Sequence, residues 1–229
     1  VISSAVLSAE EFGVPQRRRR LFISGIRGEG KFSLEDYVAP MRVEKTCLVK
    51  DAISDLPLID SSEGGEDEMD YPAIEKPLSE YQQWCRRGSE KLYNHRCPRH
   101  SDEVLETMKH IKPGMSLKKC WCFLPAHIKE RYSSPEKLHS NIYRRLAWEE
   151  LAPTIVHPRR AMLIHPSQDR VISIREAARL QSFPDIFRFY GGKSSQYQQV
   201  ADAVPPLLAE VVAKALKNAL LDFAPFLRV

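Results

Sequence analysis

Residues 12–20 read FGVPQRRRR and separate two short apolar runs near the start of the chain. The first run, residues 1–7, is apolar and rich in β-branched residues, and the second, residues 21–26, is long enough for a buried strand. Gly13 and Pro15 supply turn chemistry between them. The pattern predicts a strand, a turn and a second strand, with a cluster of arginines at the entrance of the second strand.

The polar run before the second strand is a candidate ligand site. Alternate residues of a strand share a face, so Gln16, Arg18 and Arg20 are expected on one face and Arg17 and Arg19 on the other. The arginine fork donates bidentately, so such a face can hold a phosphate or a planar base edge. A surface basic run that binds anions non-specifically remains the alternative interpretation of these five residues.

The composition limits the class of protein. The 229 residues carry a net charge of +4, with 43% hydrophobic and 28% charged residues, which excludes wholesale disorder and is compatible with a nucleic-acid partner. No apolar run approaches the roughly 20 residues of a membrane span, and no signal-peptide pattern opens the chain. Five cysteines, an odd number, favour a reducing cytoplasmic setting over a disulfide framework.

The middle of the chain, residues 31–143, alternates short helical patterns with long polar stretches. Ser79 and Gln82 form a capping box before a predicted helix at 80–87, and a second helix is expected from about 102 to 111. Residues 60–70 are acidic without a basic residue, which predicts a solvated, mobile loop.

From residue 144 onward the patterns become regular. Strands are expected at 154–156 and 161–164, and Ser173 and Glu176 form a capping box before a helix at 174–181. The longest helix is expected from the Pro205-Pro206 pair to about residue 222. Its apolar stripe has no evident partner in the middle of the chain and comprises Leu208, Val211, Val212, Ala215, Leu216 and Ala219.

The sequence favours neither a metal site nor a covalent nucleophile. A Cys₂His₂ zinc site could be drawn from His95, Cys97, His100, Cys120, Cys122 and His127. The chain has no Cys-x-x-Cys spacing, however, so buried or hydrogen-bonded side chains are the favoured interpretation, and no metal is predicted. The chain also has no glycine-rich cofactor loop and no Pro-Cys dipeptide, so we expect no covalent nucleophile in it.

Three stretches, taken in order, resemble motifs of the DNA cytosine-5 methyltransferases. Residues 9–20 resemble the family's eighth motif, Gln-x-Arg-x-Arg; residues 145–185 resemble the ninth, and residues 199–206 the tenth. Residues 51–57 also resemble bacterial members. The ordered set spans nearly the whole chain and is similar to the carboxyl-terminal half of a bacterial enzyme.

This resemblance implies an architecture. The family fold is the α/β fold of S-adenosylmethionine-dependent methyltransferases, and the chain is expected to be a fragment of it. Residues 1–30 would be carboxyl-terminal strands of the catalytic domain, and residues 31–190 a mixed α+β target-recognition domain with the ninth motif at 144–185. Residues 191–229 would carry the tenth motif and a return helix that packs on the catalytic domain outside this chain.

The resemblance also implies a mechanism. In the family, a cysteine that follows proline attacks C6 of a flipped cytosine, and S-adenosylmethionine gives its methyl group to C5. As supporting residues, Gln16 would lie at the pocket, Arg18 would organise the catalytic loop and Arg20 would meet the base near O2. The cofactor pocket would be closed on one side by Ala201, Asp202, Ala203 and Val204. The family usually has Gly-Asn where this chain has Ala201-Asp202, which is expected to weaken cofactor binding.

Duplex DNA is the expected substrate, read in the major groove by residues 31–143. The residues expected to bind DNA are Arg17, Arg19, Arg86, Arg87, Arg96, Arg99, Arg144 and Arg145. The resemblance further implies an N-terminal catalytic half or subunit as partner, with this chain inactive alone. Two alternatives remain open: a non-catalytic, sequence-specific DNA-binding module, and part of an RNA cytosine methyltransferase.

Overall fold

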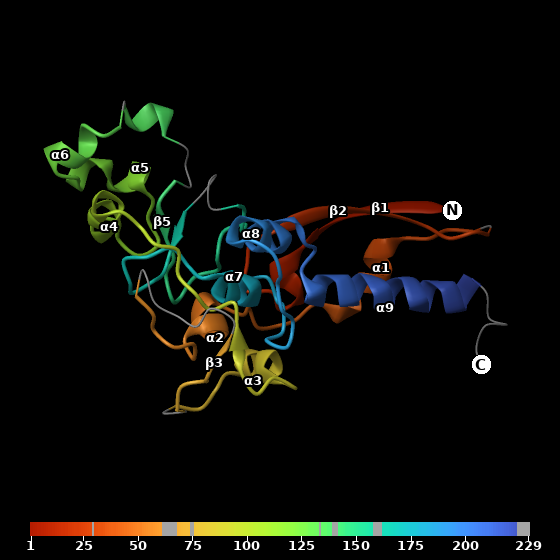
Figure 1. Cartoon of the computed structure of the whole chain (residues 1–229). Helices are drawn as coiled ribbons and strands as arrows, with labels where there is room; N and C mark the ends of the chain where they lie inside the picture. The colour runs from red at the N-terminus through yellow and green to blue at the C-terminus, as the bar shows by residue number, and fades with distance from the viewer. Residues whose placement is uncertain are drawn as a thin grey trace.

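The computed structural model describes residues 1–28, 30–60, 68–73, 76–132, 134–138, 142–157 and 162–223. Figure 1 shows an elongated arrangement of these residues, with a hairpin and the longest helix at one end and a group of short helices at the other. The acidic loop predicted at 60–70 lies for the most part outside the described residues.

The hairpin forms as the two apolar runs predict. Strands β1 (Ile2–Ser8) and β2 (Arg19–Gly25) are antiparallel, with Ile2 opposite Gly25 and Ser8 opposite Arg19. The 3-10 helix η1 (Ala9–Phe12) follows β1 and ends at Gly13, whose φ of 81° is a conformation that favours glycine. Strand β2 begins only at Arg19, so Gln16 and Arg18 lie ahead of the strand and are both buried. The predicted alternation of faces nevertheless holds, because Gln16 and Arg18 are buried and Arg20 half-buried, whereas Arg17 and Arg19 are exposed.

The longest helix, α9 (Pro206–Phe223), begins at the proline pair as expected. It packs against η1 and α1 (Leu34–Val38), which is followed by η2 (Ala39–Met41). The core of this end of the molecule consists of Leu7, Ala9, Phe12, Val14, Ile26, Phe32, Leu34, Val38, Leu208, Ala215 and Ala219. Part of the apolar stripe of α9 thus finds its partners in the first 40 residues, whose first 30 were predicted to belong to the catalytic domain.

The central core is built around α7 (Ile174–Leu180), which is buried along its whole length. Helices α2 (Val49–Ile53) and α8 (Lys193–Asp202) pack on it, and α3 (Glu80–Arg86) packs on α2. Strands β3 (Glu68–Met69) and β4 (Leu92–Tyr93) pair antiparallel beside them. Both predicted capping boxes are present, because Ser79 accepts from the Gln82 amide and Ser173 from the Glu176 amide.

The remaining short helices form a lobe at the far end from α9 (Figure 1). It contains α4 (Asp102–Lys109), α5 (Leu117–Cys120), η3 (Trp121–Phe123), α6 (Ala126–Lys129) and η4 (Pro135–Lys137). Its core includes Met108, Ile111, Leu117, Cys120, Leu124 and Ile128. Strand β5 (Arg144–Arg145) joins this lobe to the centre by pairing in parallel with β6 (Leu163–Ile164).

Some local predictions differ from the structure, and one helix was not predicted. Residues 154–156 form no strand, and helix α4 ends at Lys109 rather than at residue 111. Helix α8 was not predicted, because its apolar side is narrow: Tyr197, Val200 and Ala201 are its buried residues. No helix in the described part of the chain combines the length and apolarity that crossing a bilayer requires.

The packing of α9 on the hairpin gives a stability prediction. Leu208 is fully buried in that core, whereas Leu220 on the same helix is 45% exposed. Leu208→Ala leaves a cavity and is expected to lower the free energy of unfolding by about 2–5 kcal/mol in urea denaturation. The matched control, Leu220→Ala, is expected to change it by less than about 1 kcal/mol. Equal effects of the two variants would contradict this packing.

Candidate functional site at the junction of three motifs

A buried arginine joins three segments that are distant in sequence. Arg18 is 1% exposed, and its guanidinium donates to the carbonyl of Ile155 at 3.2 Å. The same group donates to the carbonyls of Ala201 at 2.7 Å and Ala203 at 3.0 Å. Arg18 therefore fixes the end of α8 and the loop after residue 152 against the start of β2.

Gln16 makes further hydrogen bonds that join the same part of the chain to α7 and to Ile155. Its Nε2 donates to Gln181 Oε1 at 2.6 Å and to the Leu180 carbonyl at 3.2 Å, while its Oε1 accepts from the Ile155 amide at 3.0 Å. Gln181 in turn donates to the Ala203 carbonyl at 3.1 Å. Sequence reasoning missed Gln181 and Ile155; the signal available for Gln181 was a polar residue at the end of a small-residue helix.

The junction carries a positive charge. Burial, followed by the neighbouring Arg20, lowers the pKa of Arg18 to about 10, against the opposing effect of Asp202. The group therefore remains a cation at neutral pH, with main-chain carbonyls as the acceptors of its guanidinium. Its Nε is buried and has no hydrogen-bond partner.

The other arginines of the run face outward. Arg17 and Arg19 are exposed, and half-buried Arg20 donates to the Arg19 carbonyl at 2.8 Å. The run therefore divides into two buried residues that position the backbone, Gln16 and Arg18, and three that can reach a ligand.

The four residues predicted at the cofactor lie directly against this junction. Ala201 is buried, Asp202 is exposed and accepts from Gln198 Nε2, and Val204 is 41% exposed. Ala203 supplies a carbonyl to Arg18. An exposed carboxylate next to an exposed apolar side chain fits a ligand with hydroxyl or amino donors and an apolar part, and S-adenosylmethionine has both.

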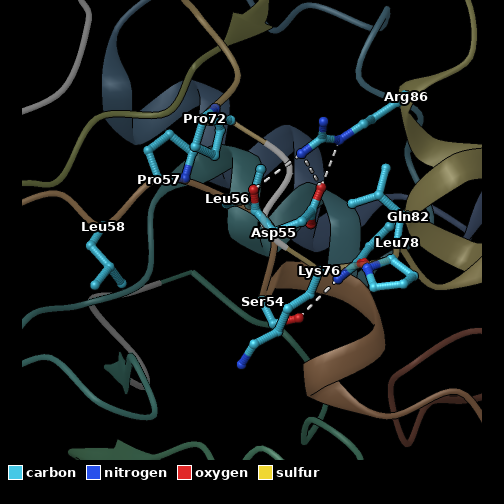
Figure 2. Close-up of a pocket in the computed structure, with 12 residues that line it drawn as sticks. Ser54, Asp55, Leu56, Pro57, Leu58, Pro72, Lys76, Leu78, Gln82 and Arg86 are labelled. Carbon is cyan, nitrogen blue, oxygen red and sulfur yellow. Dashed lines mark hydrogen bonds and ion pairs between the residues drawn. The ribbon is translucent and has the colours of Figure 1, made fainter.

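Arg86 does not fit the prediction that it binds DNA. Its Nε donates to Asp55 Oδ2 at 2.7 Å, and its guanidinium carbon lies 4.2 Å from the centroid of the Tyr71 ring. Figure 2 shows Arg86 and Asp55 turned toward each other in a surface cavity of about 440 Å³. The Arg86 charge is thus already paired.

Arg145 is the second incorrect member of the predicted DNA-binding set. It is 5% exposed, and its guanidinium donates to the carbonyls of Ile111, Met108, His165 and Gln168 and to the Asp169 carboxylate. These bonds hold β5 against the helical lobe. Arg87 and Arg99 are exposed and Arg96 and Arg144 half-buried, and for these four DNA binding stays a prediction.

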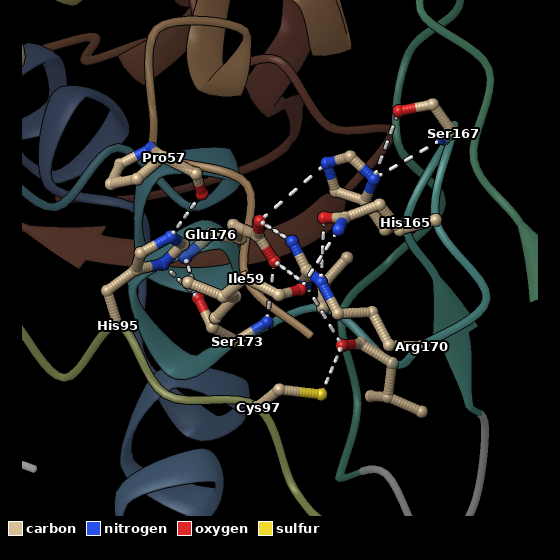
Figure 3. A network of polar contacts seen from close by, with 12 residues as sticks. Pro57, Ile59, His95, Cys97, His165, Ser167, Arg170, Ser173 and Glu176 are labelled. Atoms are coloured by element: carbon tan, nitrogen blue, oxygen red, sulfur yellow. Dashed lines mark hydrogen bonds and ion pairs between the residues drawn. The ribbon is translucent and has the colours of Figure 1, made fainter. Parts of the chain in front are cut away.

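A buried ionic network occupies the ninth-motif region (Figure 3). Arg170 donates bidentately to Glu176 at 2.8 and 2.7 Å, and His95 Nδ1 lies 2.8 Å from Ser173 Oγ. Although burial alone raises the pKa of Glu176, Arg170 holds it below its usual range. The network ties α7 to its surroundings, so these buried charges have a structural role.

The residues of the alternative zinc site have other contacts. His95 Nε2 lies 2.9 Å from the Pro57 carbonyl, and Cys97 Sγ lies 3.2 Å from the Pro98 carbonyl. Within the described ranges, no group of three or more His, Cys, Asp or Glu side chains is placed to hold a metal ion.

The Arg18 junction yields a stability prediction. Arg18→Lys keeps the charge but loses the fork that reaches three carbonyls, so the free energy of unfolding should fall by about 2–4 kcal/mol. Arg17→Lys changes an exposed neighbour and should alter it by no more than about 0.5 kcal/mol. Chemical denaturation of both variants beside the unmodified chain measures the difference, and a neutral Arg18→Lys would overturn the assigned role.

The buried histidine gives a pH prediction. Burial lowers the pKa of His165 to about 4 from 6.5, and the nearby Glu176 opposes this shift. As the pH falls below 6.5, the unfolded chain binds a proton before the folded one, so stability is lost toward pH 4 by as much as about 3 kcal/mol. Urea denaturation from about pH 7 to about pH 5 should show this loss, and His165→Gln should flatten it. Parallel curves for the two proteins would refute the assignment.

Comparisons with known proteins give the family. The family model described as "C-5 cytosine-specific DNA methylase" matches residues 1–218. The type II methyltransferase M.DdeI of Desulfomicrobium norvegicum is 34% identical over 92% of this chain and 53% of its own length. The DNA (cytosine-5)-methyltransferase 1A of Oryza sativa subsp. japonica is 29% identical over 94% of this chain and 17% of its own length.

A solved structure supports the methyltransferase fold. A prophage-encoded DNA modification methyltransferase from E. coli superimposes with a TM-score of 0.69 at 25% identity, covering 96% of this chain and 60% of that chain. The chain spans about half the length of the first curated relatives it matches.

The comparisons correct the expectation that the chain is the carboxyl-terminal half of a bacterial enzyme. The family model begins its match at residue 1 and covers the catalytic methylase region, and a plant enzyme is among the relatives. The expected separate N-terminal catalytic partner likewise finds no support. The match over residues 1–218 shows that the chain belongs to the C-5 cytosine-specific DNA methylase family, whose methyl donor is S-adenosylmethionine.

Proposed function

We propose that this chain acts in the methylation of cytosine at C5 in duplex DNA, with S-adenosylmethionine as methyl donor. The Arg18 junction is the observation that carries the proposal. It brings residues 16–20, 155 and 201–203 into contact, which are parts of the three motifs on which the family resemblance rests. Contact between motifs that are distant in sequence is the arrangement that a shared site requires.

The proposal divides the basic run by exposure. Gln16 and Arg18 are positioning residues, because their polar groups are used on the protein's own backbone. Arg20, on the outer side of the junction, would meet the flipped base near O2, and exposed Arg17 and Arg19 would contact phosphates. Flipping a base out of a duplex costs a few kcal/mol, which such contacts offset.

The cofactor would lie along residues 201–204. S-adenosylmethionine supplies the electrophilic methyl group. Val204 would contact its apolar part, and the exposed Asp202 carboxylate can accept hydrogen bonds from its hydroxyl or amino groups. The carbonyls of Ala201 and Ala203, held by Arg18, keep this short segment in place.

The cysteines of this chain are unsuited to nucleophilic attack. None follows a proline; Cys85, Cys97 and Cys120 are buried, and burial raises the pKa of half-buried Cys47, while exposed Cys122 lies on the helical lobe away from the Arg18 junction. Burial raises the pKa of both Cys85 and Cys97 to about 12, so little thiolate, the nucleophilic form, exists at neutral pH. The proposal therefore assigns this chain DNA binding and support of the methyl-donor site.

Two measurements test the proposal. Fluorescence anisotropy should show that a labelled duplex binds more tightly than transfer RNA, with an affinity that falls steeply as salt rises. Incubation of the chain alone with labelled S-adenosylmethionine and DNA should transfer no methyl group, because no cysteine is poised to attack.

The outcomes separate the alternatives. Preference for transfer RNA would favour the RNA methyltransferase alternative. Duplex binding without any binding of S-adenosylmethionine, measured by calorimetry, would favour a non-catalytic DNA-binding module, to which the Asp202 substitution already points. Methylated cytosine formed by the chain alone would show that a nucleophile was overlooked.

A further inference from the structure

The helical lobe carries a run of lysines, bounded in sequence by Glu106 and Glu130. Residues 107–129 contain five lysines and neither aspartate nor glutamate. Four of the five, Lys109, Lys112, Lys118 and Lys119, are exposed. Glu136 lies near Lys118, which is one of several groups that lower its pKa, behind its own backbone and Ser134. The other acids of the lobe include Asp102, Glu103 and Glu106 of α4, and Glu106 is paired with His127 and Arg131. The excess of positive charge on α5 and the residues beside it favours an anionic partner.

An exposed phenylalanine lies within this basic surface. Phe123 is 67% exposed, and Lys112 Nζ lies 4.9 Å from the centroid of its ring. A phenylalanine ring has no polar edge for water, so a partner that covers it gains apolar contact. Lysines beside an open aromatic ring match a partner that offers both phosphates and flat apolar surfaces.

The lobe presents these side chains on a fixed backbone. Leu117, Cys120 and Leu124 are buried in its core and Trp121 packs against it, so the other residues of α5 and η3 face outward. The α5–η3 face is defined here as Lys112, Lys118, Lys119, Cys122 and Phe123, all exposed. Figure 1 places α5 at the end of the molecule remote from α9. The face is therefore open to a large partner.

We propose that the α5–η3 face docks duplex DNA, with Lys118 and Lys119 on phosphates and Phe123 packed against the sugars or base edges of a groove. This inference deepens the proposed function and rests on it. Charge complementarity selects the occupant: Lys112, Lys118 and Lys119 are exposed cations, whereas the Arg86 and Arg145 charges are engaged within the protein.

The salt dependence of binding separates the two contact types. With a fluorescein-labelled duplex of about 20 base pairs, Lys118→Gln/Lys119→Gln should lower affinity at least tenfold and reduce the slope of log K against log salt by about 1.8, at about 0.9 per phosphate. Phe123→Ala should lower affinity at an unchanged slope, and Phe123→Leu should restore part of the loss. The matched control, Lys31→Gln/Lys217→Gln, removes two exposed charges outside the lobe, one of them on α9, and should bind as the unmodified chain does.

Cys122 provides an independent reporter in the unmodified chain. It is exposed on the same face, whereas Cys85, Cys97 and Cys120 are buried. Saturating duplex should slow alkylation of Cys122 by a maleimide severalfold, read by mass spectrometry, and leave the modification of Cys47 unchanged.

The results distinguish failure of the inference from failure of the proposed function. If the unmodified chain binds duplex but both lysine pairs have equal effects and Cys122 remains unprotected, the face is wrong and the function stands. If the unmodified chain binds no duplex, the proposed function fails and the inference fails with it.

Discussion

The contact among the three motifs depends on one buried charge, the guanidinium of Arg18. Arg18 is ionised at neutral pH and almost fully buried, so each donor without a protein acceptor carries a desolvation penalty; its two terminal nitrogens have acceptors and only its Nε does not. Its acceptors are carbonyls of residues 155, 201 and 203, and each is a fixed point on the backbone. The planar fork can reach all three only in one arrangement. The position of the segment that would border the methyl donor is thus determined by a side chain that, in our proposal, contacts neither donor nor DNA.

Helix α7 uses the same principle on a larger scale. Its buried surface includes Arg175, Glu176 and Arg179. Arg179 donates to both oxygens of Asp185 at 2.9 and 2.6 Å, and Arg170 donates to both oxygens of Glu176. Paired buried charges of this kind add little net stability relative to apolar packing, but removing one partner is strongly destabilising. Each buried charge on α7 requires its own partner nearby. This requirement fixes which residues pack against the helix, and so the relative positions of α2, α7 and α8.

Local signals in the sequence predicted local structure well. The hairpin, both capping boxes and the start of α9 follow from residues within a few positions of each other, and the structure confirms them. Burial of arginines could not be predicted in this way. The Ile155 carbonyl that holds Arg18 lies 137 residues away, and the His165 carbonyl that holds Arg145 lies 20 residues away across a parallel strand pair. When the protein carbonyls that accept from an arginine lie far away in the sequence, the sequence alone therefore suggests that the arginine binds a ligand.

The cations of this chain consequently fall into two chemical classes. Several arginines, such as Arg18, Arg145, Arg170 and Arg179, are buried and bind protein carbonyls or carboxylates, while most lysines of the helical lobe are exposed. The chemistry explains the division, because a guanidinium is weakly hydrated and offers five donors in a rigid fork, whereas an ammonium is compact and strongly hydrated. Burying a lysine costs more and satisfies fewer acceptors. For a phosphate backbone met in water, however, a mobile point charge is sufficient. The buried arginines of the motifs that carry the family resemblance therefore hold much of the frame together, and in our proposal DNA is met by the exposed Arg17 and Arg19 and by lysines that resemble no motif.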